Sequence, residues 1–166
     1  MRKLFFIMIL CLSSVCGFAQ YTFSGSSSGS ITVGTVLNMS FTNNAGTVSF
    51  SSASQYQNGQ TISICASIAV KSNIPWLISF ASNSASFTAT GGGASTNMPA
   101  SVVGLRVSSA SSFTSLSTVN HTLATGNAGN TSASGNSFNL DLNLNPGFSY
   151  KGGTYSLSIV YTLTNQ

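Results

Sequence analysis

Residues 138–145 read FNLDLNLN. Every second residue of this stretch is apolar, from Phe138 to Leu144, and the residues between them are Asn or Asp. Side chains of a β-strand point alternately to the two faces of its sheet, so this pattern predicts a strand with one face in the core and the other in water. Alternation of this one-sided kind is typical of antiparallel sheets.

The same alternation recurs along the rest of the chain. Residues 154–164 repeat it, and the turn signals at 145–147 and 151–153 predict a hairpin or meander between the two stretches. Weaker signals lie at 21–23 and 31–33. Further inward-facing sets are predicted for Ile62, Ile64, Ala66, Ile68 and Val70; for Trp76, Ile78 and Phe80; for Leu37, Met39 and Phe41, followed after a turn signal at 43–46 by Val48 and Phe50; for Val103, Leu105 and Val107; and for Val119, His121 and Leu123. No stretch has apolar residues at helical spacing, so we expect an all-β fold, an antiparallel two-sheet sandwich of about eight or nine strands.

The N-terminus has the features of an export signal. A basic start (Arg2, Lys3) precedes an apolar run at 4–12 and a small-residue exit that ends at Ala19. This pattern predicts a signal peptide over 1–19, cleaved between Ala19 and Gln20. The apolar run is shorter than the roughly 20 residues that span a bilayer. We therefore expect one domain over 20–166 that is secreted or displayed at the cell surface, and not an integral membrane protein.

Charged residues and cysteines are scarce. Beyond the predicted signal peptide the chain has three cations (Lys71, Arg106, Lys151) against one acid (Asp141), a net formal charge of +2. Three isolated cations do not form the cluster that binding to phosphates needs, so no nucleic-acid partner is predicted. Cys65 is the one cysteine left, so no intrachain disulfide is expected, and we interpret Cys65 as a small buried hydrophobe.

The chain offers little material for catalysis. Acid–base chemistry needs titratable groups placed against each other, and the predicted mature chain has one His, one Asp and no Glu. A triad can be drawn from His121, Asp141 and a serine, but no Gly-x-Ser-x-Gly turn accompanies it. We interpret Asp141 as an exposed strand residue and His121 as a half-buried, hydrogen-bonded one. Since these residues and Cys65 also make a poor ligand set for zinc or calcium, we expect no enzyme, no cofactor and no metal site.

Aromatic residues in polar segments are the remaining candidates for ligand contact. Tyr56 lies in the stretch SQYQN at 54–58, and Phe148 and Tyr150 lie in a turn. Carbohydrate-binding sandwiches combine such rings with amide and hydroxyl hydrogen bonds, so Tyr56 and Tyr150 are the candidate ligand contacts. The alternative is that these rings cap an edge of the sandwich. Trp76 and Tyr161 share faces with aliphatic residues and are expected in the core.

Two stretches carry a resemblance to known families. Residues 70–80 read VKSNIPWLISF and residues 152–164 read GGTYSLSIVYTLT. They resemble the SN-x-x-W-x-L core and the G-x-Y … Y-T-L-T closing strand of bacterial surface sandwiches of the WxL-like and pilin-like spore-coat-U types. The resemblance implies an immunoglobulin-like sandwich with a structural or adhesive role at a bacterial surface. The chain lacks the paired Trp-x-Leu motifs of WxL domains, so cell-wall binding is not carried over, and Asn165 stands where assembling pilins have an aromatic residue.

These observations favour a secreted or surface structural or adhesive sandwich, a candidate subunit of a surface assembly whose partners would be other surface proteins or further copies of itself. Self-association would proceed by strand addition at a sheet edge, with Gln20–Val33 as the candidate donor segment. The alternative function is a non-catalytic carbohydrate-binding module. A hydrolase built around His121 and Asp141 is the third hypothesis.

Overall fold

The computed structural model describes residues 30–166. Its compact unit comprises Gly34–Gln166, and residues 30–33 fall in a separate unit. The predicted signal peptide, its cleavage point between Ala19 and Gln20 and the strand signal at 21–23 lie outside the described residues. No strand forms over 31–33, so that weaker strand prediction is wrong. No helix in residues 30–166 is both long and apolar enough to cross a membrane.

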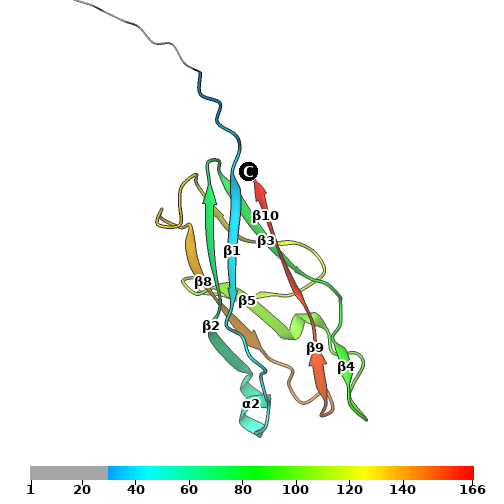
Figure 1. The fold of residues 1–166 in the computed structure, drawn as a ribbon. Coiled ribbons are helices and arrows are strands. Elements are labelled where there is room, and N and C mark those ends of the chain that lie inside the picture. Colours follow the sequence, from blue (N-terminus) through cyan, green and yellow to red (C-terminus); the bar gives the residue numbers. More distant parts are fainter. Residues whose placement is uncertain (1–29) are drawn as a thin grey trace, which may run out of the picture. The chain divides into compact units, whose positions relative to one another are not determined.

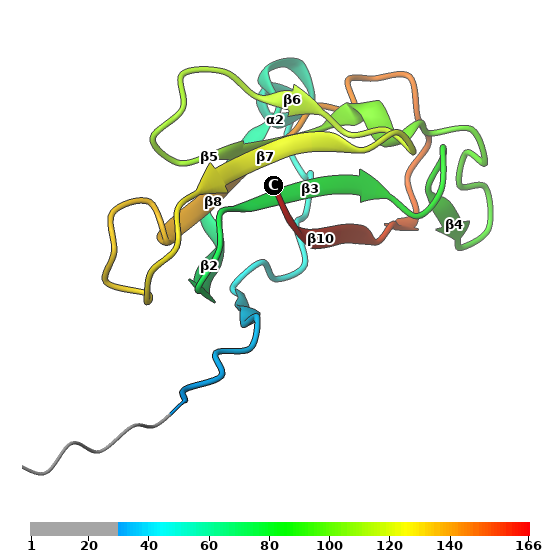
Figure 2. The ribbon, with the colours of Figure 1, turned by 90° about the horizontal axis from the view of Figure 1, so that it is seen from above.

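The domain is an antiparallel β-sandwich (Figure 1), which confirms the predicted all-β class. The larger sheet has five strands, in the order β1 (Leu37–Asn43), β2 (Gln60–Ser72), β8 (Ser137–Leu144), β5 (Val103–Val107) and β6 (Thr114–Ser115). Figure 2 shows the second sheet, in which β3 (Trp76–Ser82) lies between β10 (Ile159–Asn165) and β7 (His121–Gly126). A separate pair joins β4 (Thr88–Thr90) to β9 (Thr154–Ser156), and the two helices are α2 (Ala53–Asn58) and η1 (Ala100–Val102). The described residues thus hold ten strands, more than predicted, because β4, β6 and β9 are too short to show alternation.

The core is built on the inward face of β3. Trp76, Ile78 and Phe80 are buried there as predicted, against inward residues of the larger sheet such as Ile68, Val70, Leu105 and Leu140. The indole Nε1 of Trp76 donates a hydrogen bond of 3.1 Å to Oδ1 of the fully buried Asn136. A Cβ atom on Gly126 would collide with the Trp76 ring, so the close passage of β7 requires glycine at this position.

The predicted hairpin between residues 138–145 and 154–164 is not formed. β8 pairs with β2 and β5 in the larger sheet, whereas β10 pairs with β3 in the other sheet. The chain therefore crosses from one sheet to the other between them. Alternation shows only that each strand has one apolar face. Two strands that are neighbours in one sheet and two strands that face each other across the core both have this property, so the pattern does not identify the partner of a strand.

A bulge in β2 corrects a second expectation. The register between β2 and β8 shifts between Ile62 and Ala66, and Ile64 has a φ of 54°. As a result Ile64, predicted to face inward, is 48% exposed, and Cys65 is buried in its place. The burial predicted for Cys65 is confirmed, although periodicity alone put it on the outer face.

The stretch after β1 also differs from its prediction. Val48 and Phe50 were expected to form an inward-facing strand segment after a turn at 43–46, but residues 44–51 have no regular secondary structure and lead into α2. A capping box begins that helix, because the Ser52 hydroxyl accepts from the Gln55 amide while the Gln55 side chain accepts from the Ser52 amide. Similarly, β7 begins only at His121, and Val119 lies outside it and is exposed.

Candidate functional site

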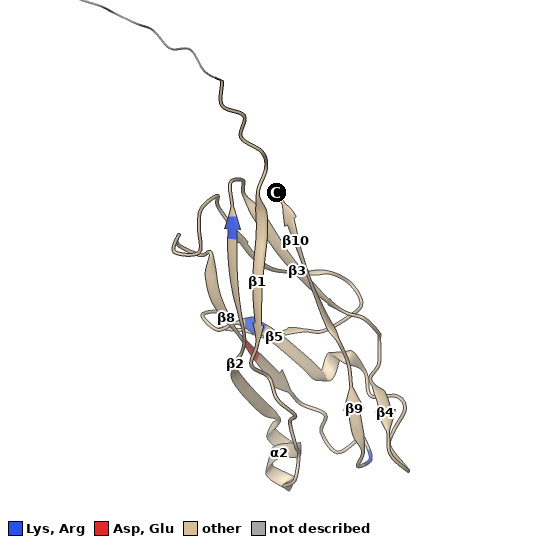
Figure 3. Cartoon of the chain, in the orientation of Figure 1, with Lys and Arg blue, Asp and Glu red and all other residues tan. Residues whose placement is uncertain are grey.

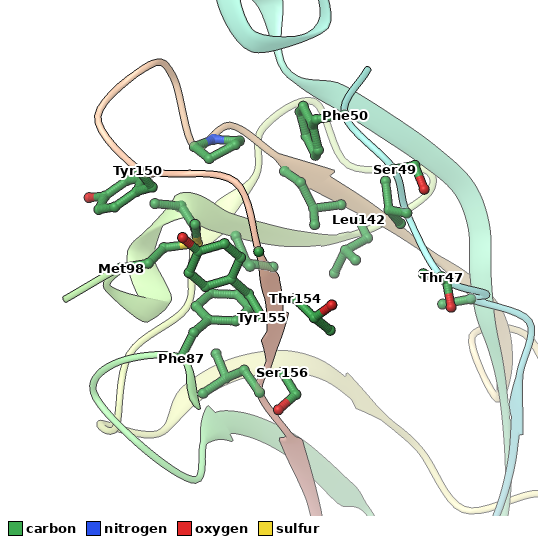
Figure 4. Close-up of a pocket in the computed structure, with 18 of the residues that line it drawn as sticks. Thr47, Ser49, Phe50, Phe87, Met98, Leu142, Tyr150, Thr154, Tyr155 and Ser156 are labelled. Carbon is green, nitrogen blue, oxygen red and sulfur yellow. The ribbon is translucent and has the colours of Figure 1, made fainter. Parts of the chain in front are cut away.

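A pocket of about 660 Å³ opens along one side of the sandwich. Figure 4 shows Thr47 and Ser49 on one wall and Tyr150 and Tyr155 on the other. Between the walls lie apolar side chains from several elements. The apolar residues that line the pocket include Phe50, Phe87, Met98, Val103, Leu116, Leu142 and Leu144.

The first wall exists because the chain leaves the larger sheet after β1. β1 pairs with β2 as far as Asn43 and Ala66, and one more hydrogen bond of 2.8 Å joins the Asn44 amide to the Cys65 carbonyl. Beyond this point the backbone of Gly46, Thr47 and Val48 makes no hydrogen bond to any described residue. Backbone groups without partners at a sheet edge are a template for an added strand.

The second wall exists because the chain changes sheets between β9 and β10. Residues 154–164 were predicted as one alternating run, but Asn83 interrupts it at Ser158. The Asn83 amide donates to the Ser158 carbonyl, and the Ser158 amide donates to the Asn83 Oδ1, each over 3.1 Å. β9 is thereby directed to β4 and β10 to β3. The hydroxyl of Tyr155 accepts from the Ser95 amide over 3.0 Å and donates to the Lys151 carbonyl, which fixes this wall.

Above the pocket the edge strands β1 and β10 lie near each other without pairing (Figure 1). The rings of Phe41 and Tyr161 meet across the gap, with centroids 4.9 Å apart. Burial raises the pKa of the Tyr161 hydroxyl well above its ordinary value, as expected for a residue that faces the core. The two edges and the pocket form a continuous side of the domain, and we call this side the open edge: β1, residues 44–50, residues 150–158 and β10.

The structure brings the two predicted ligand contacts to one place, since both Tyr56 and Tyr150 line the pocket. Tyr56 stands in the middle of an aromatic stack. Its ring centroid lies 5.4 Å from that of Phe50 and 5.6 Å from that of Phe148, and the rings of Tyr56 and Phe148 are inclined by 26° to each other. The Tyr56 hydroxyl donates to the Phe50 carbonyl over 3.3 Å. Sequence reasoning did not identify Phe87 and Met98, because they lie in loops without alternation.

Asp141 is not the exposed strand residue that was predicted. It is 4% exposed, and its carboxylate accepts hydrogen bonds from the Ser108 hydroxyl (2.7 Å), the Ile64 amide (3.1 Å) and the Arg106 guanidinium (3.0 Å). The guanidinium in turn lies over the ring of Phe113. These hydrogen bonds, first that of Ser108 and then that of Ile64, lower the pKa of Asp141 below its ordinary value. The carboxylate holds the β2 bulge in place, and Figure 3 shows how few other charges the fold carries.

His121 and Asp141 are not brought together. The Nε2 atom of His121 lies 2.9 Å from the Ser117 hydroxyl, and its ring packs against Phe80 on the inner face of the second sheet. His121 is half-buried and hydrogen bonded as predicted. The Asp141 carboxylate is bonded to Ser108, Ile64 and Arg106 within the larger sheet and makes no hydrogen bond to His121.

Cys65 lies in the core near Tyr161. Burial, followed by the negative charge of Asp141, raises the pKa of its thiol from 9.0 to about 11. A thiol with so high a pKa is a poor nucleophile near neutral pH. Within residues 30–166, no three His, Cys, Asp or Glu side chains lie together as a metal site would require.

Comparison with known proteins identifies no family for this chain. The sequence matches no protein-family model, and no curated protein is similar to it. The resemblance to WxL-like and spore-coat-U type sandwiches therefore stays a prediction.

Proposed function

We propose that this protein is a secreted or cell-surface structural or adhesive sandwich that assembles with further copies of itself by strand addition at the open edge. The observation that carries the proposal is the pocket between two chain segments whose edges are unpaired. An added strand would hydrogen bond to the free backbone groups and place alternate side chains on the exposed part of the core.

The chain itself contains a segment of suitable chemistry for this role. Between Gln20 and Val33 its apolar residues share one parity, namely Tyr21, Phe23, Ile31 and Val33. The side chain of Ile31 is 90% exposed and that of Val33 is 77% exposed. At about 3.3 Å per residue, the fourteen residues from Gln20 would reach about 46 Å when extended, roughly twice the span of the seven-residue β1.

The attachment of this segment also suits assembly. The Val36 amide donates to the Asn73 Oδ1 over 2.7 Å, and the Asn73 amide nitrogen Nδ2 donates to the Gly34 carbonyl over 2.7 Å. These bonds fix residues 34–36 at the end of the domain where β1 begins and β10 ends. The pocket lies toward the opposite ends of these strands. A segment leaving one copy at this end can therefore enter the pocket of the next copy in a head-to-tail chain.

The test compares the oligomeric state of the chain from Gln20 with that of the chain from Gly34, by size-exclusion chromatography with light scattering. We expect multimers of the longer chain and monomers of the shorter one. Ile31→Asp should abolish the multimers, since it places a charge against the pocket. Thr32→Asp adds the same charge at the other parity and should leave them intact.

The acceptor is tested separately with Thr47→Pro. Proline removes one of the free backbone donors, and no existing hydrogen bond of the domain is lost. This variant of the chain from Gly34 should no longer bind a synthetic peptide of residues 20–33 that the unchanged domain binds. If the chain from Gln20 is strictly monomeric at all concentrations, or if Thr32→Asp and Ile31→Asp behave alike, strand addition by this segment is wrong.

A further inference from the structure

The aromatic stack of Phe50, Tyr56 and Phe148 presents an exposed ring on a rigid support. Phe148 is 69% exposed and is the most exposed aromatic side chain of the described residues. Its ring is supported by Tyr56, which rests on Phe50. Exposing the phenylalanine ring to water forgoes the free energy of burying its apolar surface, and a ligand that lies on the ring would recover it.

The support beneath Phe148 is held by hydrogen bonds at several points. Tyr56 belongs to α2, whose first turn is fixed by the capping box, and its hydroxyl is bonded to the Phe50 carbonyl. The turn that carries Phe148 starts at Asn145, whose amide donates to the Val102 carbonyl over 2.8 Å, and continues through Pro146 and through Gly147 at a φ of 61°. The ring is therefore oriented before any ligand arrives, which lowers the entropic cost of binding.

Three neutral polar side chains lie within three residues of Tyr56 or Phe148 along the chain. The side chains of Gln57, Asn145 and Tyr150 make no hydrogen bond to any described residue, whereas those of Tyr56 and Asn58 on α2 do. Figure 4 shows the Tyr150 ring at the outer rim of the pocket. Amide and phenol groups of this kind can donate to and accept from hydroxyl groups. No acidic side chain is present there, since Asp141 is the chain's one acid and it is buried in the larger sheet.

We propose that Phe148, supported by Tyr56, binds an uncharged pyranose ring of a polysaccharide. The apolar C–H face of the sugar would lie on the Phe148 ring, while Gln57, Asn145 and Tyr150 would hydrogen bond its hydroxyl groups. A hydroxyl-rich, neutral ligand matches an aromatic ring whose polar neighbours along the chain are uncharged, apart from Lys151, which follows Tyr150 and lines the pocket. Tyr56 and Tyr150 also line the pocket, so the sugar site borders the strand-addition site, although Phe148 itself does not line that pocket.

The experiment uses the chain from Gln20 and measures retardation in gels that contain dextran, laminarin or yeast mannan, with polygalacturonate as the anionic counterpart. We expect retardation by at least one neutral polymer, with a dissociation constant about tenfold weaker for Phe148→Ala. Phe148→Tyr keeps an exposed ring and should retain binding. Val119→Ala removes an equally exposed apolar side chain elsewhere on the domain and should change nothing.

Circular dichroism of each variant shows whether the fold is kept, and the Ile31→Asp variant separates the two proposals because it removes assembly but should leave sugar binding unchanged. The inference is overturned if no neutral polymer retards the protein, if polygalacturonate alone does so, or if Phe148→Ala binds as tightly as the unchanged chain.

Discussion

The two ends of the sandwich differ sharply in closure although they are built from the same kinds of residue. Around Trp76 and Asn136 the sheets meet over fully buried side chains, and the strands of each sheet are paired with their neighbours within that sheet. Around Phe50 and Leu142 equally apolar side chains border an open pocket. The difference lies in backbone pairing, because β1 stays bonded to β2 at the first end and the chain departs from β2 at the second. An incomplete sheet, and not a shortage of apolar residues, makes the candidate site.

The strongest test of this contrast is Trp76→Ala at the closed end. It removes the most deeply buried aromatic ring and leaves the Asn136 side chain without its donor, so we expect a loss of about 3–5 kcal/mol in the free energy of unfolding. Urea denaturation followed by circular dichroism measures it. A loss below about 1.5 kcal/mol would mean that the closed end is not the stabilising part of the fold.

The second test concerns Asp141, which fastens the bulge where the two ends meet. Asp141→Asn should cost about 2–3 kcal/mol at neutral pH, since Arg106 and the Ile64 amide lose a charged acceptor. The native pKa of Asp141 lies below 3.8, so its stabilisation is complete above that value and is lost as the pH falls through the native pKa.

Because Asp141 is the chain's one acidic side chain, the pH dependence is unusually easy to assign. The free energy of unfolding between pH 6 and pH 2 should fall more steeply for the unchanged protein than for Asp141→Asn. Parallel curves for the two proteins would contradict the proposed role of the carboxylate.

A smaller effect is expected at the open end. Phe50→Ala removes a half-buried ring beside the pocket, where water already reaches its neighbours, and should cost about 1–1.5 kcal/mol. The measurement is the same urea series. A cost equal to that of Trp76→Ala would show that the pocket is closed in solution.

The smallest expected effect concerns the reactivity of the Cys65 thiol and not the stability of the fold. A pKa raised from 9.0 to about 11 reduces the thiolate fraction of Cys65 about 100-fold at a given pH, and burial adds a steric barrier. In the chain from Gln20, where Cys65 is the one cysteine, a colorimetric disulfide reagent should react at once in urea and very slowly with the native protein. Fast reaction of the native thiol would show that the core opens at the bulge.

Alternation in the sequence predicted the faces of strands well and their partners poorly. It placed Trp76, Ile78 and Phe80 in the core and gave β8 its correct orientation, because these features depend on nearest neighbours in the chain. It could not show that β8 and β10 belong to different sheets. It also missed the bulge at Ile64, which is stabilised by a carboxylate 77 residues away in the sequence.

The candidate site was also predicted only in part, because single residues were identified and their spatial arrangement was not. Tyr56 and Tyr150 were selected for their polar surroundings, and both line the pocket, but the pocket itself was not predicted. Val48 and Phe50 follow the turn signal at 43–46 and alternate with polar residues, so their pattern predicted a further strand and gave no sign that the chain stays irregular there. One local signal was available, the capping box at Ser52 and Gln55, which marks the start of α2 and hence an end to the strand before it.

The pairing of Arg106 with Asp141 leaves Lys71 and Lys151 as the only charged side chains of residues 30–166 without an opposite charge beside them. Neighbouring domains of this kind would meet with almost no mutual repulsion, and dissolved ions would have little to screen. Their association should therefore depend little on ionic strength, so that a head-to-tail chain of such domains would be equally stable at low and at high salt concentration.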